Sequence, residues 1–189
     1  MNKVWFFCLA MVILPAVYVR AADDGFGDAN TIEGEHFNID YKNGADLNAL
    51  TENLKISDTD QQLANLRIDN SSTEKELASK IEILFNRASD VLDMHVLSLK
   101  GHIKVFADHK QLEEFYHRLF TGNLPCTGFS FYLPDYDSIY MSAFNFRREI
   151  LGHEMGHAIM TRYFVVQPSI KIQEVLACYV EYQLRKSKQ

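Results

Sequence analysis

Apolar residues recur along the chain at two spacings, and each spacing predicts a different kind of element. In the segment 35–41, Phe37, Ile39 and Tyr41 alternate with polar neighbours, which is typical of a half-buried strand. From Thr73 to about Val96 the apolar residues instead recur every three or four positions, as on one side of a helix. Applied to the whole chain, the two spacings predict strands at 35–41, 102–107, 128–133 and 138–143, and helices at 46–56, 73–96, 109–120, 147–163 and 170–186.

The order of these elements predicts an α+β fold, with a small mixed β-sheet packed on helices in a single domain at 35–189. The residues at 134–137, Pro-Asp-Tyr-Asp, have the composition of a hairpin turn between the last two strands. Pro168 and Ser169 interrupt the chain between the two C-terminal helices. Because that connection is short, we expect these two helices to pack antiparallel. The polar stretch 57–72 favours neither kind of element.

The N-terminus has the pattern of a secretory signal peptide at 1–21. Its apolar run Val4–Val19 contains a proline and is shorter than the roughly 20 residues that span a bilayer, so we expect cleavage after Ala21. An uncleaved membrane anchor is the alternative. The segment 22–34, rich in Asp, Gly and Ala, is expected to be a mobile mature N-terminus. The chain is therefore expected to be exported, and to be periplasmic or secreted.

Removal of 1–21 would leave 17 Lys and Arg against 25 Asp and Glu. An acidic chain without a cluster of basic residues is a poor candidate for binding nucleic acid or anionic membranes, and we expect no stable membrane insertion after cleavage. Cys126 and Cys178 would be the remaining cysteines. Export permits a disulfide between them, although two buried free thiols are the simpler expectation.

His153, Glu154 and His157 form the pattern H-E-x-x-H within the predicted helix 147–163. Histidines four positions apart lie on the same side of a helix, where both imidazoles can bind one Zn²⁺ and the glutamate can face an activated water. The neighbouring residues on that side are mostly apolar. Polar groups set into an apolar surface are costly unless a metal or a hydrogen-bond network satisfies them. The alternative is a helix that carries the pattern without a metal.

A catalytic zinc site needs a third protein ligand, and the last helix offers Glu174, Cys178 and Glu181 on one side. If the two helices are antiparallel, His157 lies roughly 9 Å from the turn and Glu174 roughly 7.5 Å, so the two are level. Cys178 would lie roughly 13.5 Å from the turn and Glu181 roughly 18 Å. Glu174 is therefore the predicted third ligand, with Cys178 second. The small residues Gly152, Gly156, Ala177 and Cys178 would allow a close crossing.

The sequence His153–His157 followed by Glu174-Val175-Leu176-Ala177 resembles the gluzincin branch of zinc metallopeptidases, particularly small exported bacterial domains of the peptidase MA type. The resemblance covers about the C-terminal half of the chain. It implies a zincin-like fold in which an edge strand before the motif helix aligns an extended substrate. Asp137–Ser142 occupies that place in the sequence, although it could equally be an ordinary buried strand.

The resemblance also implies a tyrosine or histidine that stabilises the oxyanion, for which the candidates are Tyr140, Tyr163, Tyr179 and Tyr182. The five remaining histidines lie on unrelated elements and are expected to be surface or packing residues.

These observations favour an exported zinc-dependent hydrolase, most plainly a metallopeptidase. His153, His157 and Glu174 would bind Zn²⁺, and Glu154 would act as the general base. The substrate would be a polypeptide or another amide, such as a cell-wall bond. The alternative is a catalytically weak metal-binding or substrate-binding periplasmic module on the same fold. The presence of Glu154, the predicted general base, disfavours this alternative.

Overall fold

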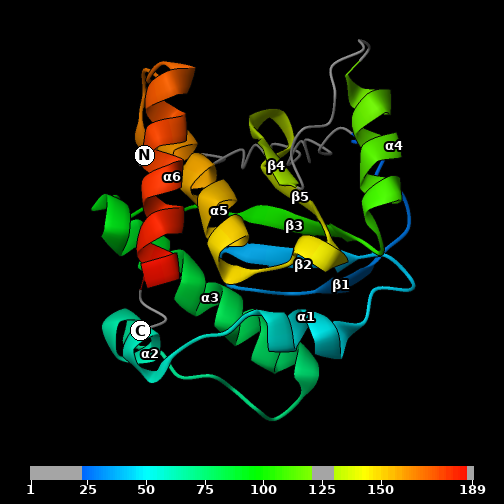
Figure 1. Ribbon diagram of the computed structural model, residues 1–189, viewed down its shortest axis with the longest axis horizontal. Coiled ribbons are helices and arrows are strands. Elements are labelled where there is room, and N and C mark those ends of the chain that lie inside the picture. The colour runs from blue at the N-terminus through cyan, green and yellow to red at the C-terminus, as the bar shows by residue number, and fades with distance from the viewer. Residues whose placement is uncertain (1–22, 121–129, 187–189) are drawn as a thin grey trace, which may run out of the picture.

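A computed structural model describes residues 23–120 and 130–186, which form a five-stranded sheet and six α-helices (Figure 1). The strands are β1 (Asn30–Ile32), β2 (Phe37–Tyr41), β3 (Gly101–Phe106), β4 (Ser130–Leu133) and β5 (Ser138–Ser142). The helices are α1 (Leu47–Asn53), α2 (Asp58–Ala64), α3 (Thr73–Leu92), α4 (His109–Leu119), α5 (Arg148–Tyr163) and α6 (Ile170–Lys186). The predicted α+β class with a mixed sheet is confirmed.

The strand order is β1-β2-β3-β5-β4, with β2, β3 and β5 parallel and the two outer strands antiparallel to their neighbours. The turn at 134–137 joins β4 to β5 as predicted, with Asp137 in the left-handed region at φ 46°. Of the two interpretations of Asp137–Ser142, the ordinary buried strand is confirmed and the edge strand was wrong. All five residues of β5 are buried because the strand lies between β3 and β4. The sheet edge beside α5 is β4.

Helices cover the two faces of the sheet unequally. The face formed by Ile39, Ile103 and Ile139 packs into the main core, to which α1, α3, α5 and α6 also contribute buried side chains. The opposite face carries Phe106 and Tyr140, which pack with α4 in a smaller aromatic cluster. Sheet pairing explains this division, because register partners on adjacent strands point to the same side.

In the segment expected to be a mobile N-terminus, Asp24, Phe26 and Ile32 are buried and the other described residues are mostly exposed. The Phe26 ring is buried among aromatic residues, with its centroid 4.9 Å from that of Phe106. Asp24 is also buried, and strand β1 pairs with β2. The composition of 22–34 predicts mobility because it contains few apolar residues, but a single phenylalanine and a paired aspartate fix this segment on the sheet.

Local hydrogen bonds set the starts of two helices. Helix α2 forms within the unassigned stretch 57–72, where Ser57 and Asp60 make a reciprocal capping box. Helix α3 begins as expected, but its N-cap is Ser72, whose hydroxyl accepts a hydrogen bond from the Lys75 amide. Both are local hydrogen-bond patterns that hydrophobic periodicity does not detect.

Helices α5 and α6 lie side by side and run antiparallel, as predicted (Figure 1). A Cβ added at Gly156 would lie 3.4 Å from the Ala177 Cα, and one added at Gly152 would lie 2.1 Å from Leu184 Cδ1. The glycines therefore allow the close crossing that the sequence suggested. Cys178 takes no part in it, because its side chain is exposed. No helix in the described ranges is long and apolar enough to cross a membrane.

Candidate metal centre

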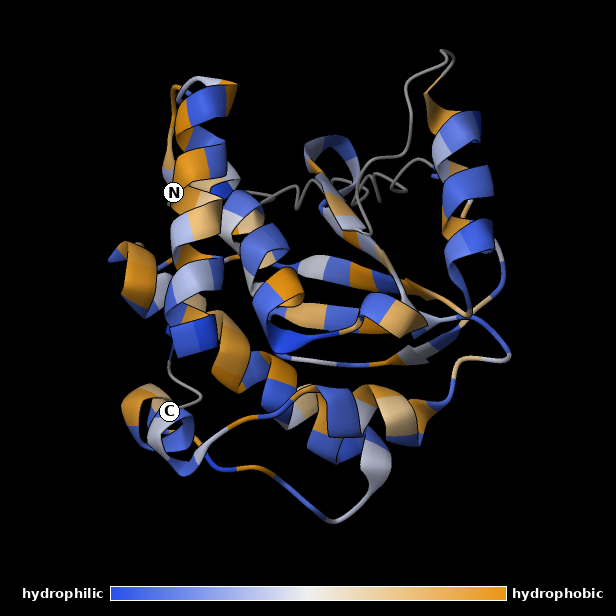
Figure 2. Ribbon diagram, in the orientation of Figure 1, coloured by the Kyte–Doolittle hydropathy of each residue, from blue (hydrophilic) through white to orange (hydrophobic). Residues whose placement is uncertain are grey.

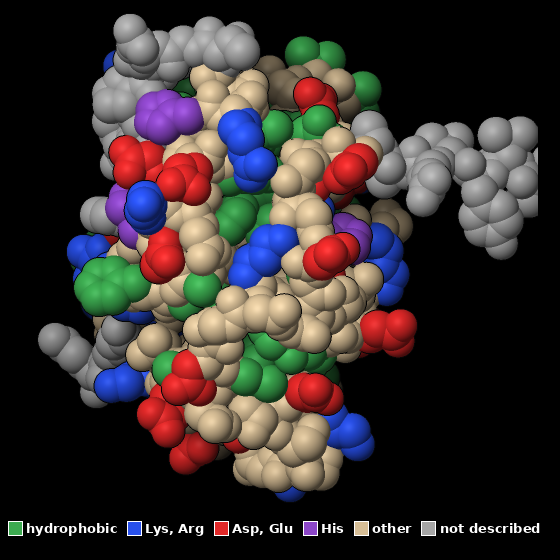
Figure 3. Space-filling model, turned by 90° about the vertical axis from the view of Figure 1, so that its right-hand side faces the viewer, with side chains coloured by type: hydrophobic (Ala, Val, Ile, Leu, Met, Phe, Trp, Pro, Cys, Tyr) green, Lys and Arg blue, Asp and Glu red, His purple; other side chains and the backbone are tan. Residues whose placement is uncertain are grey.

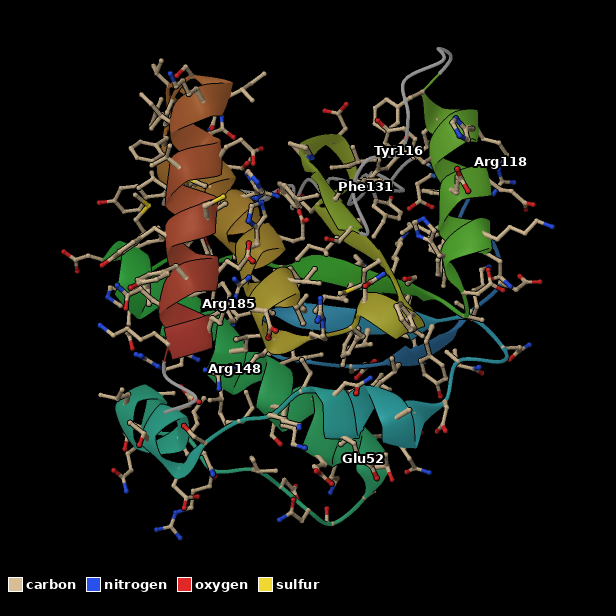
Figure 4. The ribbon with its side chains drawn as sticks, viewed as in Figure 1. Glu52, Tyr116, Arg118, Phe131, Arg148 and Arg185 are labelled. Atoms are coloured by element: carbon tan, nitrogen blue, oxygen red, sulfur yellow. The ribbon has the colours of Figure 1, made fainter. Side chains whose placement is uncertain are left out.

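The start of α5 is fixed by a buried ion pair. Arg148 lies beneath the first turn of the helix (Figure 4), and its guanidinium is 3.1 Å from the Asp60 carboxylate. It also donates a hydrogen bond of 3.0 Å to the Lys55 carbonyl. These contacts connect α5 to the α1–α2 region. The rotation of α5 about its axis, and with it the direction of the two motif histidines, is thereby restrained.

Three predicted ligands converge between α5 and α6. His153 and His157 lie one turn apart, and their Nε2 atoms are 3.2 Å from each other. The Glu174 carboxylate approaches from α6, with one oxygen 3.5 Å from His157 Nε2 and the other 3.6 Å from His153 Nε2. The structure therefore brings together the three residues that the sequence predicted.

The spacing of these atoms fits a zinc ion. At ordinary Zn–N and Zn–O bond lengths, the ligand atoms of a tetrahedral site lie about 3.3 Å apart. The three observed separations, 3.2, 3.5 and 3.6 Å, lie close to that value. Two imidazole nitrogens and a carboxylate also match the ligand types of catalytic zinc sites. The side chains of both histidines are mostly buried, whereas that of Glu174 is 52% exposed, so the site opens toward solvent on the Glu174 side.

Glu181 lies on the far side of the His153 ring. Its carboxylate is 3.5 Å from His153 Nδ1, a buried atom that makes no hydrogen bond within the described residues. A carboxylate beside one ring nitrogen favours the tautomer protonated at that nitrogen, which leaves the other lone pair for a metal. From the sequence, Glu181 was predicted to lie too far along α6 from the level of His157 to be a third ligand. It did not anticipate that Glu181 could orient His153.

Cys178 and Glu181 form a second group with His153, in which one possible ligand atom from each residue lies within 4.8 Å of the others. Burial and the neighbouring carboxylates of Glu181 and Glu174 raise the pKa of the thiol, so the uncharged form is favoured. The expectation of two buried thiols was wrong for Cys178, which is exposed and free among the described residues. Cys126 lies outside those residues.

Glu154 points away from α6, toward the edge strand β4. Its carboxylate is buried and accepts a hydrogen bond of 2.7 Å from the Ser130 hydroxyl. The backbone amide of Tyr132 also donates to it. The predicted general base is therefore held by two donors of the edge strand. Ser130 was missed by sequence reasoning, because a lone serine four residues after Cys126 carries no motif.

The pKa values of two site residues are shifted toward their uncharged forms. Burial raises the pKa of Glu154, although the Ser130 hydroxyl and His153 act against it. Burial and the adjacent His153 lower the pKa of His157, although the nearby Glu174 carboxylate raises it. A neutral imidazole is the form that binds a metal, and a carboxyl group with a raised pKa is suited to exchanging protons near neutral pH.

A pocket of about 590 Å³ opens in front of these residues, lined by His153, Glu154 and His157 from α5 and by Glu174 from α6. Its opposite wall comes from α4 and β4, where Tyr116 and Phe131 lie toward one another with ring centroids 5.4 Å apart (Figure 4). The wall therefore combines an aromatic surface with the phenol of Tyr116.

None of the four tyrosines suggested for the oxyanion lines this pocket. Tyr140 is buried on the other face of the sheet, where it bonds Asp24. Tyr163, Tyr179 and Tyr182 are exposed. The tyrosines at the pocket are Tyr116 and Tyr132, and the hydroxyl of Tyr132 already donates to Asp137 at 3.3 Å. The prediction was wrong because it considered only tyrosines close to the motif or after it in the sequence. Tyr116 reaches the site from a helix 37 positions before His153.

Comparisons of the chain with models of known protein families, with curated proteins and with solved structures found no match in any of the three. The site must therefore be judged on its own geometry and chemistry.

Proposed function

We propose that the protein is a zinc-dependent hydrolase, and that it acts as a metallopeptidase. The observation that carries the proposal is the convergence of His153 Nε2, His157 Nε2 and the Glu174 carboxylate at separations of 3.2 to 3.6 Å. These three residues would hold the ion. Glu154 lies in the same pocket without belonging to the ligand set. An ion-binding set beside a buried carboxylate in an accessible pocket is the arrangement that hydrolysis requires.

A bound Zn²⁺ would supply Lewis acidity at the scissile carbonyl. Glu154 would take a proton from the attacking water and deliver it to the leaving amine. The raised pKa of Glu154 favours the first of these transfers, because the protonated carboxyl is less costly in a buried position. The donors Ser130 and Tyr132 would hold the carboxylate in one orientation while the proton moves.

The edge strand supports a peptide substrate. The strand β4 pairs with β5 on one side and lines the pocket through Ser130, Phe131 and Tyr132. A polypeptide in extended form could add to the outer edge of β4 and pass the site with its backbone aligned. A mixed sheet whose antiparallel edge strand contacts the HExxH helix is also what a zincin-like fold would require.

The test is peptide hydrolysis by the zinc-loaded protein, screened with a library of fluorogenic peptides and repeated with Glu154→Gln. We expect cleavage by the wild type and a loss of about 10²–10⁴-fold in kcat for the variant, which keeps its zinc. Zinc binding without cleavage of any peptide, and without any change between the two proteins, would reject the peptidase and leave the metal-binding module.

A further inference from the structure

Exposed apolar side chains are concentrated on one part of the molecule. Eight of the eleven large apolar residues that are exposed in the described chain lie between Tyr163 and Tyr182. At the end of the α5–α6 hairpin, Val165 is 101% exposed, Val166 84% and Ile170 78%. Hydrophobic positions are visible at this end of the hairpin in Figure 2. Single exposed apolar residues are ordinary, but a contiguous group of this size marks an interaction site.

The exposed apolar side chains continue along α6. Ile172, Val175, Tyr179 and Tyr182 are separated by three, four and three residues, so they form one stripe on the helix. We call this stripe the α6 outer face. The helix already buries Ala177, Val180 and Leu184 on its other side. Packing within the domain therefore explains the apolar residues on the inner side of α6. It does not explain why the outer side is apolar as well.

The charged residues of α6 are unevenly placed around the helix, and Arg185 is paired with Glu181. Lys171 lies four residues before Val175 and Lys186 four residues after Tyr182, so both basic residues extend the α6 outer face, and both are exposed. The two glutamates of the helix, Glu174 and Glu181, are instead directed toward His153. The outer face thus combines apolar and basic side chains and no acidic one, in a chain of net charge −6.

Other surfaces of the molecule differ from this one. On the α4 side, basic and acidic side chains are interspersed (Figure 3). On α4 itself, Lys110 lies 3.8 Å from Glu114, and His117 lies 3.9 Å from Glu113. A net negative charge predicts poor binding to anionic surfaces only if the charges are evenly spread. On α6, Glu174 and Glu181 are directed toward His153 and Arg185 pairs with Glu181, whereas Lys171 and Lys186 border the apolar stripe.

We propose that the hairpin end (Val165, Val166 and Ile170) and the α6 outer face bind an anionic lipid surface. The valines project from the end of a hairpin, and a bilayer interface accepts projecting apolar groups without a complementary groove. Tyrosines with an apolar ring and a polar hydroxyl favour the interfacial region, and lysines are attracted to anionic headgroups. A helix with one apolar face and basic borders lies in the interface and does not span it.

The docking surface adjoins the metal centre without including it. Ile170 lines the same pocket as His157 and Glu174, so binding through the hairpin end would place the pocket mouth beside the lipid surface. The proposal needs neither zinc nor catalysis. If the protein is a peptidase, as proposed above, its substrates would be segments of polypeptide that lie close to a membrane.

The test is sedimentation with vesicles of phosphatidylcholine alone and of equal parts phosphatidylcholine and phosphatidylglycerol. The wild type is compared with Val165→Ser/Val166→Ser, with Lys171→Glu/Lys186→Glu, and with the control Leu97→Ser/Phe144→Ser. The control removes two apolar side chains that are 86% and 82% exposed elsewhere. Every protein keeps the same N-terminal residues, so that segment contributes equally to all of them.

We expect the wild type and the control to bind the anionic vesicles equally, with weaker binding to neutral ones. The valine variant should bind about tenfold less, and the charge-reversal variant should lose the preference for anionic lipid. Equal loss in the control, or no wild-type binding to either vesicle, would overturn the proposal. A stable dimer that the valine substitutions dissociate would overturn it as well, because a second copy would then occupy the surface. Unchanged thermal melting of each variant establishes that it is folded.

Discussion

The two faces of the sheet both carry buried ionisable groups, but they satisfy them in different ways. On the α4 face, Asp24 is bonded by Lys104 and Tyr140, and Asp40 accepts a hydrogen bond of 2.7 Å from His102. Burial alone would raise the pKa of both aspartates, but these hydrogen bonds more than offset it and lower the pKa of each. This face stabilises the charged forms.

The groups around the candidate metal centre on α5 differ, although the start of the same helix carries the Arg148–Asp60 ion pair. Two imidazoles and a carboxylate meet at the candidate metal centre, His153 Nδ1 makes no hydrogen bond within the described residues, and the pKa shifts of Glu154 and His157 disfavour charge. Buried polar groups normally find partners. A network with a donor for every acceptor stabilises the fold, whereas several acceptors that converge without a donor indicate a place for a cation. Under the proposed function, the hydrogen-bonded groups of the α4 face stabilise the fold, and the converging groups on α5 and α6 would hold the metal ion.

The largest predicted effect is on zinc affinity, and it should distinguish His157 from His102, although each has a carboxylate neighbour. His157→Ala should weaken zinc binding on the order of a thousandfold or more, because it removes a ligand. His102→Ala should leave zinc binding unchanged, since His102 contacts Asp40 on the other face. Competition titration with a chromophoric chelator measures both. Equal weakening by the two substitutions would contradict the assignment of separate roles.

A smaller effect is expected at Glu181. Its replacement by alanine should reduce zinc affinity about 10–100-fold, because His153 would lose the group that fixes its tautomer. Arg185→Ala is the matched control, since it removes only the exposed partner of Glu181. If zinc affinity is the same in wild type and Glu181→Ala, then Glu181 has no part in orienting His153.

On the α4 face, Asp24→Asn should lower the free energy of unfolding by about 1–3 kcal/mol, because it leaves a mostly buried ammonium without its carboxylate. Zinc binding should not change. The exposed Asp28→Asn on the same segment should have little effect on either. Urea unfolding of the three proteins at neutral pH checks the prediction.

The same substitution should alter the pH dependence of stability. The folded-state pKa of Asp24 is lowered, so its contribution is complete above the ordinary aspartate pKa of about 3.9 and is lost as pH falls through the lower folded-state value. The difference between wild type and Asp24→Asn should therefore shrink in acid. A difference that grows on acidification would mean that folding raises the pKa of Asp24, and would contradict the assigned direction.

The smallest effect concerns Ser130. Ser130→Ala should reduce kcat for peptide hydrolysis by about three- to tenfold with KM and zinc content unchanged, because Glu154 loses one of its two donors. Ser130→Thr should restore most of the activity. Ser138→Ala, on the neighbouring strand, is the control, since its hydroxyl bonds the Tyr136 carbonyl and not Glu154. A change in KM alone would assign Ser130 to substrate binding.

Much of the α5 face could be predicted from the sequence because its geometry is local. Residues four apart on one helix must face the same way, and a short loop places Glu174 level with His157 on the next helix. The edge strand could not be predicted in this way. Whether β4 or β5 lies outside depends on pairing with β3, a contact between residues more than thirty positions apart.

On the opposite face, the helix and the strands could be predicted from the sequence, but their hydrogen bonds could not. Asp24 and Tyr140, which form its central hydrogen bond, are separated by 116 positions. No periodicity connects them, and the segment around Asp24 has the composition of a mobile terminus. Ser130 and Tyr116 were missed for the same reason, since each reaches the pocket only through the packing of β4 and α4.

The most direct test of the central claim is the zinc content of the folded, zinc-replete wild-type protein, measured beside Glu174→Ala and Cys178→Ser. We predict about one zinc per chain in the wild type, its loss in Glu174→Ala, and its retention in Cys178→Ser. A folded wild type that binds no zinc would contradict the account, and His153, His157 and Glu174 would then be a cluster without a metal.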